Sequence, residues 1–163
     1  MRKWLIIATV LALMGAAIYN VAWARHGRLM ANMNGTQEID PETGENEAGD
    51  TDGTGKARIT LRPNNDQVCY RVSWRNIGSP NMAHIHAGER GTNGGIVVTL
   101  FMQESPLPGS INAVEGCAND VPDSTSDEIR DNPRDFYVNV HNADFPGGAI
   151  RGQLKHPRSR GRR

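Results

Sequence analysis

The sequence has little cysteine, no excess of charge of either sign and, beyond residue 24, no long apolar run. Its 18 basic residues balance its 18 acidic residues. A chain without a strong positive charge is a poor match for nucleic acid as its main partner. No apolar run beyond residue 24 is long enough to cross a bilayer, so we expect no membrane segment there. A Ser-His-Asp order, a pair of catalytic carboxylates and a nucleotide motif are also absent, which disfavours an enzyme.

Residues 1–24 have the pattern of a secretory signal peptide. Arg2 and Lys3 precede an apolar run, and Ala22-Trp23-Ala24 places small residues where cleavage occurs. We expect cleavage after Ala24, and the alternative is an uncleaved N-terminal anchor. Both alternatives predict that the rest of the chain is secreted or periplasmic. We expect a single domain over residues 25–155 and a basic, disordered tail over residues 156–163.

Cys69 and Cys117 are an even pair in a chain that we expect outside the cytoplasm. Such a pair predicts one disulfide, and two free thiols are the alternative. A bridge that closes a loop of about 50 residues stabilises a domain by about 2–4 kcal/mol, mainly by restricting the unfolded chain.

Apolar and polar residues alternate with the two-residue period of β-strands in much of the chain. The predicted strands cover residues 28–33, 56–61, 67–74, 82–86, 96–101, 136–141 and 149–154. One short helix is expected over residues 124–130, and residues 106–122 are expected to be irregular. Residues 35–55 are expected to form a long, acidic, solvated connection. About seven or eight short strands with this spacing indicate an all-β sandwich or barrel.

Two of these predicted strands carry three of the five histidines. His84 and His86 lie two residues apart in the alternating segment 83–88, so they share one strand face. His141 ends a second alternating segment, residues 137–141. If the two strands meet, three imidazoles converge, and imidazole is a ligand that suits copper and zinc. The alternative is a structural role, in which the histidines hydrogen-bond to the backbone and to each other.

Three further polar residues are candidates for supporting roles. Asn139 shares a strand face with His141, and Asn139 and Asp144 are candidates to orient metal-bound imidazoles. Arg151 lies in the last predicted strand, where we expect a bidentate ion pair with Asp144 or Glu38. Such a pair ties the last strand to the first, and an anionic ligand is the alternative partner.

The order of these motifs resembles the CHRD domain, a module first described in chordin and found in many secreted bacterial proteins. The segments that carry the resemblance are Asn34–Glu38, Gly55–Leu61, Val68–Tyr70, Ala83–Gly88 with Gly91–Gly94, Tyr137–His141 and Phe145–Leu154. The resemblance covers about residues 30–155. It implies a Greek-key β-sandwich related to the immunoglobulin-like and copper–zinc superoxide dismutase architectures, with no defined reaction. The acidic stretch around Glu42–Asp52 is longer than the simplest family pattern.

Superoxide dismutase activity is not expected, because that class needs a bridging histidine and a separate zinc set. No histidine lies between His86 and His141 to supply them. We therefore expect a CHRD-type binding or structural module rather than an enzyme, with an extracytoplasmic protein or a polysaccharide as partner. The alternative is a copper- or zinc-binding protein that uses His84, His86 and His141. A third hypothesis is an adhesion or matrix protein whose basic tail, Pro157–Arg163, contacts acidic polymer or the cell surface.

Overall fold

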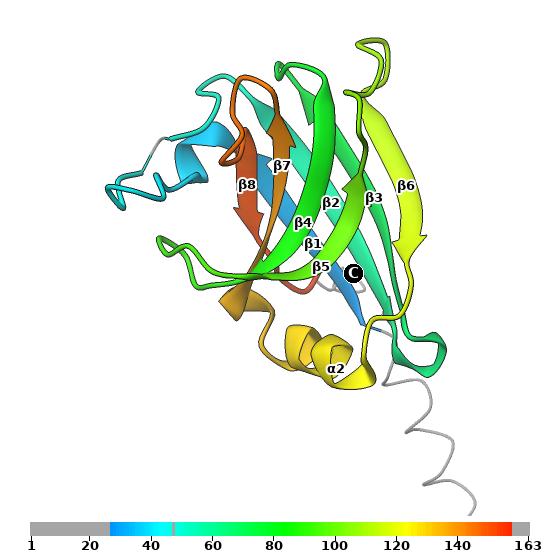
Figure 1. Ribbon diagram of the computed structural model, residues 1–163. Coiled ribbons are helices and arrows are strands. Elements are labelled where there is room, and N and C mark those ends of the chain that lie inside the picture. The colour runs from blue at the N-terminus through cyan, green and yellow to red at the C-terminus, as the bar shows by residue number, and fades with distance from the viewer. Residues whose placement is uncertain (1–26, 47, 158–163) are drawn as a thin grey trace, which may run out of the picture.

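The computed structural model describes residues 27–46 and 48–157, so the expected signal peptide and most of the basic tail lie outside it. The described chain is an all-β fold of eight strands, which confirms the expected fold class (Figure 1). The strands are β1 (Arg28–Asn34), β2 (Thr54–Arg62), β3 (Gln67–Arg75), β4 (Pro80–Ala87), β5 (Ile96–Met102), β6 (Ala113–Ala118), β7 (Phe136–Asn142) and β8 (Ile150–Gln153). The helical elements are α2 (Asp123–Asp131) and three short 3-10 turns, η1 (Gly35–Gln37), η2 (Pro63–Asn65) and η3 (Pro133–Asp135). None of the helices in these ranges is long and apolar enough to span a bilayer.

All eight strands belong to one antiparallel sheet in the order β5-β4-β7-β8-β1-β2-β3-β6. The first three strands form a meander, whereas the connections after β3, β5 and β6 each cross to another part of the sheet. The sheet curls, so that its two edge strands, β5 and β6, approach each other (Figure 1). The layers expected of a sandwich are therefore two halves of one continuous, curled sheet.

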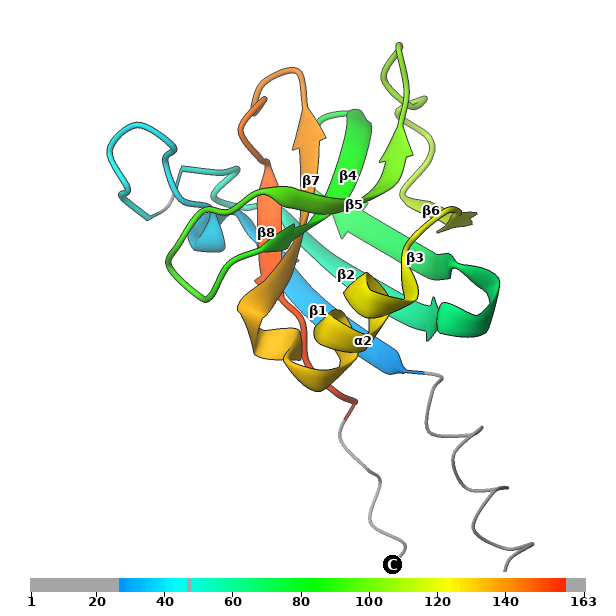
Figure 2. The same ribbon diagram turned by 60° about the horizontal axis from the view of Figure 1, so that its bottom comes forward.

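The core lies inside the curl and is built by the alternation of the strands. Alternate residues of each strand point inward, as Ala83 and Ile85 do in β4 and Val138 and Val140 do in β7. Helix α2 covers one end of the sheet and buries Ile129 completely (Figure 2). Full burial of an aliphatic side chain of this size contributes about 1.5–3 kcal/mol. One face of every central strand is thus committed to the core.

Strand β6 occupies residues that the sequence analysis expects to be irregular, and that expectation was wrong. Its residues are small or polar, and it lies at a sheet edge where only one side is paired, so its alternation signal is weak. Pairing with β3 places Cys69 directly opposite Cys117, and the two form the expected disulfide. The disulfide therefore links an edge strand to its only neighbour in the sheet.

The acidic connection between β1 and β2 is packed against the sheet rather than fully solvated. Glu38 and Ile39 are buried, with 3% and 6% of their surfaces exposed. The amide of Asp50 donates to the carbonyl of Ala149 at 2.9 Å, which fastens the connection beside β8. The acidic composition of the connection gave no indication that these two side chains are buried. The connection therefore covers part of the outer face of the sheet.

Candidate metal centre

Strands β4 and β7 are neighbours in the sheet, as a histidine cluster requires. Their inward residues form part of the core, so the intervening residues lie on the outer face. On that outer face the directly opposite pairs are Met82 with His141, His84 with Asn139, and His86 with Tyr137. The three histidines that the sequence analysis singles out therefore lie together outside the core.

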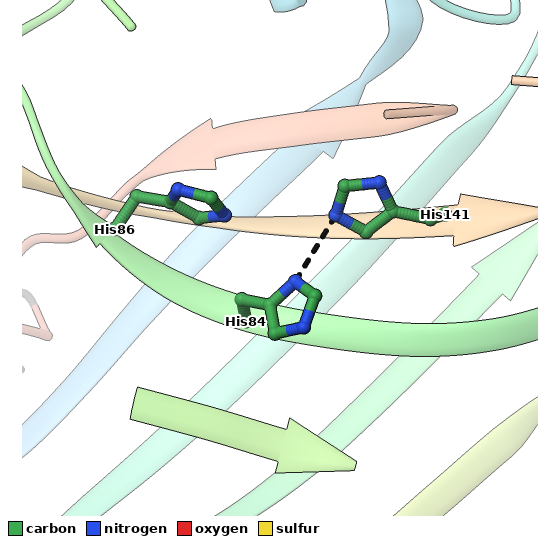
Figure 3. A group of neighbouring side chains, drawn as sticks. All are labelled: His84, His86 and His141. Atoms are coloured by element: carbon green, nitrogen blue, oxygen red, sulfur yellow. Dashed lines mark hydrogen bonds between the residues drawn. The ribbon is translucent and has the colours of Figure 1, made fainter. Parts of the chain in front are cut away.

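The three imidazoles converge on one point (Figure 3). One ring nitrogen from each of His84, His86 and His141 lies within 4.8 Å of the others. The closest pair is His84 Nδ1 and His141 Nε2, which are 3.1 Å apart. A copper or zinc ion bound at about 2.0–2.1 Å holds its nitrogens about 3–4 Å apart. A small contraction of the cluster therefore produces a three-nitrogen site.

Two loops that cover the outer face fix the orientation of two of these rings. His86 Nδ1 donates a hydrogen bond to the carbonyl of Gly94 at 2.9 Å. His141 Nδ1 donates to the carbonyl of Pro146, also at 2.9 Å. Because a carbonyl only accepts, each Nδ1 carries the proton and each neutral ring keeps a lone pair at Nε2. Backbone carbonyls hold metal-binding histidines in this same way in known metal sites.

Two buried ring nitrogens of the cluster lack a hydrogen-bond partner within the described ranges: Nε2 of His84 and Nε2 of His86. His84 Nδ1 donates to His141 Nε2, because the one ring proton of His141 is on Nδ1 and is donated to the carbonyl of Pro146. A buried nitrogen without a partner costs about 1–3 kcal/mol. A cation at the centre of the cluster would satisfy His86 Nε2, which points toward the other two rings, whereas His84 Nε2 points away from them (Figure 3).

Burial keeps all three imidazoles neutral. Burial, together with the smaller effects of the neighbouring His141 and His86, lowers the pKa of His84 to about 4. Burial also lowers the pKa of His86 and of His141, although their bonds to Gly94 and Pro146 oppose this effect. A neutral imidazole is the form that binds a metal ion. Binding at neutral pH therefore needs no net loss of protons, but the His84 proton must move from Nδ1 to Nε2 so that Nδ1 can face the ion.

Of the two candidates for an orienting role, the structure places only Asn139 in the cluster. Asn139 is 2% exposed and its Oδ1 has no partner among the described residues. Its side chain lies near His86 and opposes the lowering of the His86 pKa by burial. Asp144 is exposed, and it is the carbonyl of Pro146 that bonds to His141 Nδ1.

Arg151 is 2% exposed, and its contacts differ from the expected bidentate ion pair. Its guanidinium donates to the carbonyls of Glu89 and Thr92 at 3.1 and 2.6 Å and to Asn93 Oδ1 at 3.1 Å. In the described part of the chain it has no carboxylate within 4.0 Å. The acceptors of its hydrogen bonds all lie in the loop after β4, so Arg151 holds this loop over the outer face.

Glu38 is the carboxyl group whose charge interacts with the Arg151 guanidinium. Burial raises the pKa of Glu38 to about 8, and the charge of Arg151 opposes that rise. A side chain at Gly148 would collide with the Glu38 carboxyl group, so the glycine is needed there. The acidic connection therefore reaches the loop between His141 and Arg151.

Tyr137 is a site residue that the sequence analysis did not identify. Its ring stacks on His86 with centroids 4.8 Å apart and planes 6° from parallel. The guanidinium of Arg151 lies over the same ring, 3.4 Å from its centroid. The only sequence signal was its place on the same strand face as Asn139 and His141.

The fold and the cluster define a disulfide-linked, curled β-sheet domain with a histidine site on its outer face. The sequence matches the CHRD domain family over residues 29–154, and the chain belongs to this family. The match confirms the resemblance seen in the motifs, and it assigns no reaction to the domain. No curated protein and no solved structure matches the chain.

Proposed function

We propose that this CHRD-domain protein binds one copper or zinc ion outside the cytoplasm through His84, His86 and His141. The observation that carries the proposal is the convergence of three neutral imidazoles within 4.8 Å. The donor set fits both ions, because each favours imidazole nitrogen. The disulfide supports a secreted or periplasmic location, where such bonds persist.

The competing structural role explains the site less well. Buried histidines with a purely structural role form hydrogen bonds through both ring nitrogens, because a buried nitrogen without a partner is costly. Here His86 and His84 each retain a buried Nε2 without a partner among the residues described. Three histidine ligands also leave a coordination position free for a further ligand.

The test is a calorimetric titration of the untagged mature protein with Zn(II) and, separately, with Cu(II). We expect one ion per chain, and a loss of affinity of at least about 100-fold when His84 and His86 are both changed to alanine. His156→Ala is the matched control, because His156 is exposed and lies outside the cluster. Equal binding by the double variant and the parent protein contradicts the proposal, provided that circular dichroism shows both folded.

A polar groove favours a second candidate function, the binding of an acidic polysaccharide. The groove has a volume of about 950 Å³ and lies along β1 and β8. It is lined by Asn32, Asn34, Thr36, Gln37, Glu89, Arg90, Arg134, Asp135, Gln153, Leu154 and Lys155. Three of these residues are cationic and two are anionic, and polar side chains predominate. Such a lining suits a hydrated polymer that carries carboxylate groups.

Retention on immobilised alginate, with neutral dextran as the control polymer, tests this second candidate. We expect retention that weakens with salt and is lost when Arg134 and Lys155 are both changed to alanine, because exposed charge attraction is screened. Equal retention of that variant contradicts a role for the groove. In that case, deletion of the basic tail, Pro157–Arg163, would test whether the tail binds the polymer.

A further inference from the structure

Two methionines extend the histidine cluster toward the edge of the sheet. Met82 lies directly opposite His141 on one side and directly opposite Met102 on the other. The next pairs in the register, Ala83 with Val140 and with Phe101, consist of core residues. Met82, His141 and Met102 therefore all lie on the outer face, in one row across β7, β4 and β5.

The spacing of this row brings sulfur within reach of the cluster. Directly opposite residues in an antiparallel pair have Cβ atoms about 4.5–5.5 Å apart. A methionine side chain has three rotatable bonds, so its sulfur can move over a wide range from that position. Met82 is also two residues from His84 on the same strand face. Its thioether can therefore reach two of the three imidazoles.

The row also reaches the solvent-exposed edge of the sheet. The loop that carries Gly94 follows β4 beside His86, and the loop that carries Pro146 follows β7 beside His141, so the two loops lie at opposite ends of these antiparallel strands. The edge strand β5 lies beside β4, and on it Thr99 is exposed and Met102 is 60% exposed. Met82 is half-buried between Met102 and His141. The two methionines thus lie, in the register, between the exposed edge of the sheet and His141.

Thioether sulfur is a soft ligand that selects monovalent copper over zinc and divalent copper. It also has no proton to lose, so it remains a ligand in acid. We propose that Met82 adds a thioether ligand to the histidine cluster, that the site takes Cu(I), and that Met102 is where the ion first binds. This inference rests on the proposed function, because it assigns the ion that the histidines would hold.

The experiment measures Cu(I) affinity by competition with bicinchoninate, with ascorbate as the reductant so that the disulfide stays intact. We expect Met82→Leu to weaken Cu(I) binding by at least about tenfold and to leave Zn(II) binding within about twofold. Met102→Leu is expected to slow loading from the Cu(I)–bicinchoninate complex with little change in affinity. X-ray absorption of the Cu(I) form is expected to show copper–sulfur scattering that Met82→Leu removes.

Met30→Leu is the matched control, because Met30 is half-buried on β1, which β7 and β8 separate from β4. Equal Cu(I) affinity of Met82→Leu and the parent, or absence of copper–sulfur scattering, overturns the inference while Zn(II) binding still supports the histidine site. Zn(II) binding that survives alanine at His84 and His86 overturns the proposed function instead. The two failures are therefore distinguishable.

Discussion

The guanidinium carbon of Arg151 lies 3.4 Å from the centroid of the Tyr137 ring, and Tyr137 in turn stacks on His86. The same guanidinium holds the loop whose Gly94 carbonyl accepts the His86 proton. His86 is thus supported on its face by a stacked ring and at its edge by a loop that one buried arginine fastens.

Replacement of Arg151 by lysine is expected to destabilise the domain by about 2–4 kcal/mol, because lysine lacks the planar fork that reaches three acceptors. The loop over His86 should also loosen. Urea unfolding measures the stability, and hydrogen exchange of residues 88–95 measures the loop. Arg71→Lys is the control, since Arg71 makes only an exposed pair with Glu115. Unchanged exchange in that loop would contradict this role for Arg151.

Alanine at Gly94 is expected to weaken metal binding by about 10–100-fold, the usual effect of disturbing a group that orients a ligand. A Cβ at Gly94 would overlap the carbonyl oxygen of Ala87, so the loop must move and release His86. Gly95→Ala is the matched control, because a Cβ there meets nothing within 4 Å. Calorimetry with Zn(II) compares the two variants, and equal affinities would show that the Gly94 carbonyl does not matter.

The stability of the metal-free protein should fall on both sides of a pH optimum. Burial lowers the His84 pKa from 6.5 to about 4, so between these values the unfolded chain binds more protons and acid destabilises the fold. Burial raises the Glu38 pKa from 4.5 to about 8, so the folded chain binds more protons there and rising pH destabilises it. Urea unfolding at a series of pH values measures both effects.

Glu38→Gln separates the two effects. The amide cannot ionise, so the Glu38 effect between pH 4.5 and about 8 should disappear, most clearly above pH 6.5 where His84 no longer opposes it, while the acid side remains. At pH 8 we expect the variant to be more stable than the parent by on the order of 1–3 kcal/mol. Glu42→Gln is the control, because Glu42 is exposed in the same connection. A parent-like pH profile of Glu38→Gln would show that Glu38 is already ionised in the fold.

Replacement of both Cys69 and Cys117 by serine is expected to cost about 2–4 kcal/mol of stability, because the bridge restricts an unfolded loop with a sequence separation of 48. Zn(II) affinity should not change, because the bridge joins β3 to β6 and neither strand pairs with β4 or β7. Thermal unfolding and calorimetry measure the two effects. A large loss of Zn(II) affinity in the folded variant would show that the two ends of the sheet are coupled.

Much of the site was predictable because strand alternation is a local property. The spacing of His84 and His86 fixed their common face, and the even pair of cysteines, in a chain that we expected outside the cytoplasm, predicted the disulfide. Strand β6 was not predictable, because its small and polar residues carry little alternation and its pairing with β3 decides its conformation.

The sequence by itself determined seven of the eight strands, the faces on which the histidines lie and the pairing of the cysteines. Tertiary structure decided that β4 lies beside β7, although His84 and His141 are 57 residues apart. It also decided that Gly94 and Pro146 hold the rings and that the loop after β4 satisfies Arg151. The physical reason is that every residue carries the same backbone carbonyl, so the partners of a side chain depend on which strands and loops the fold brings together.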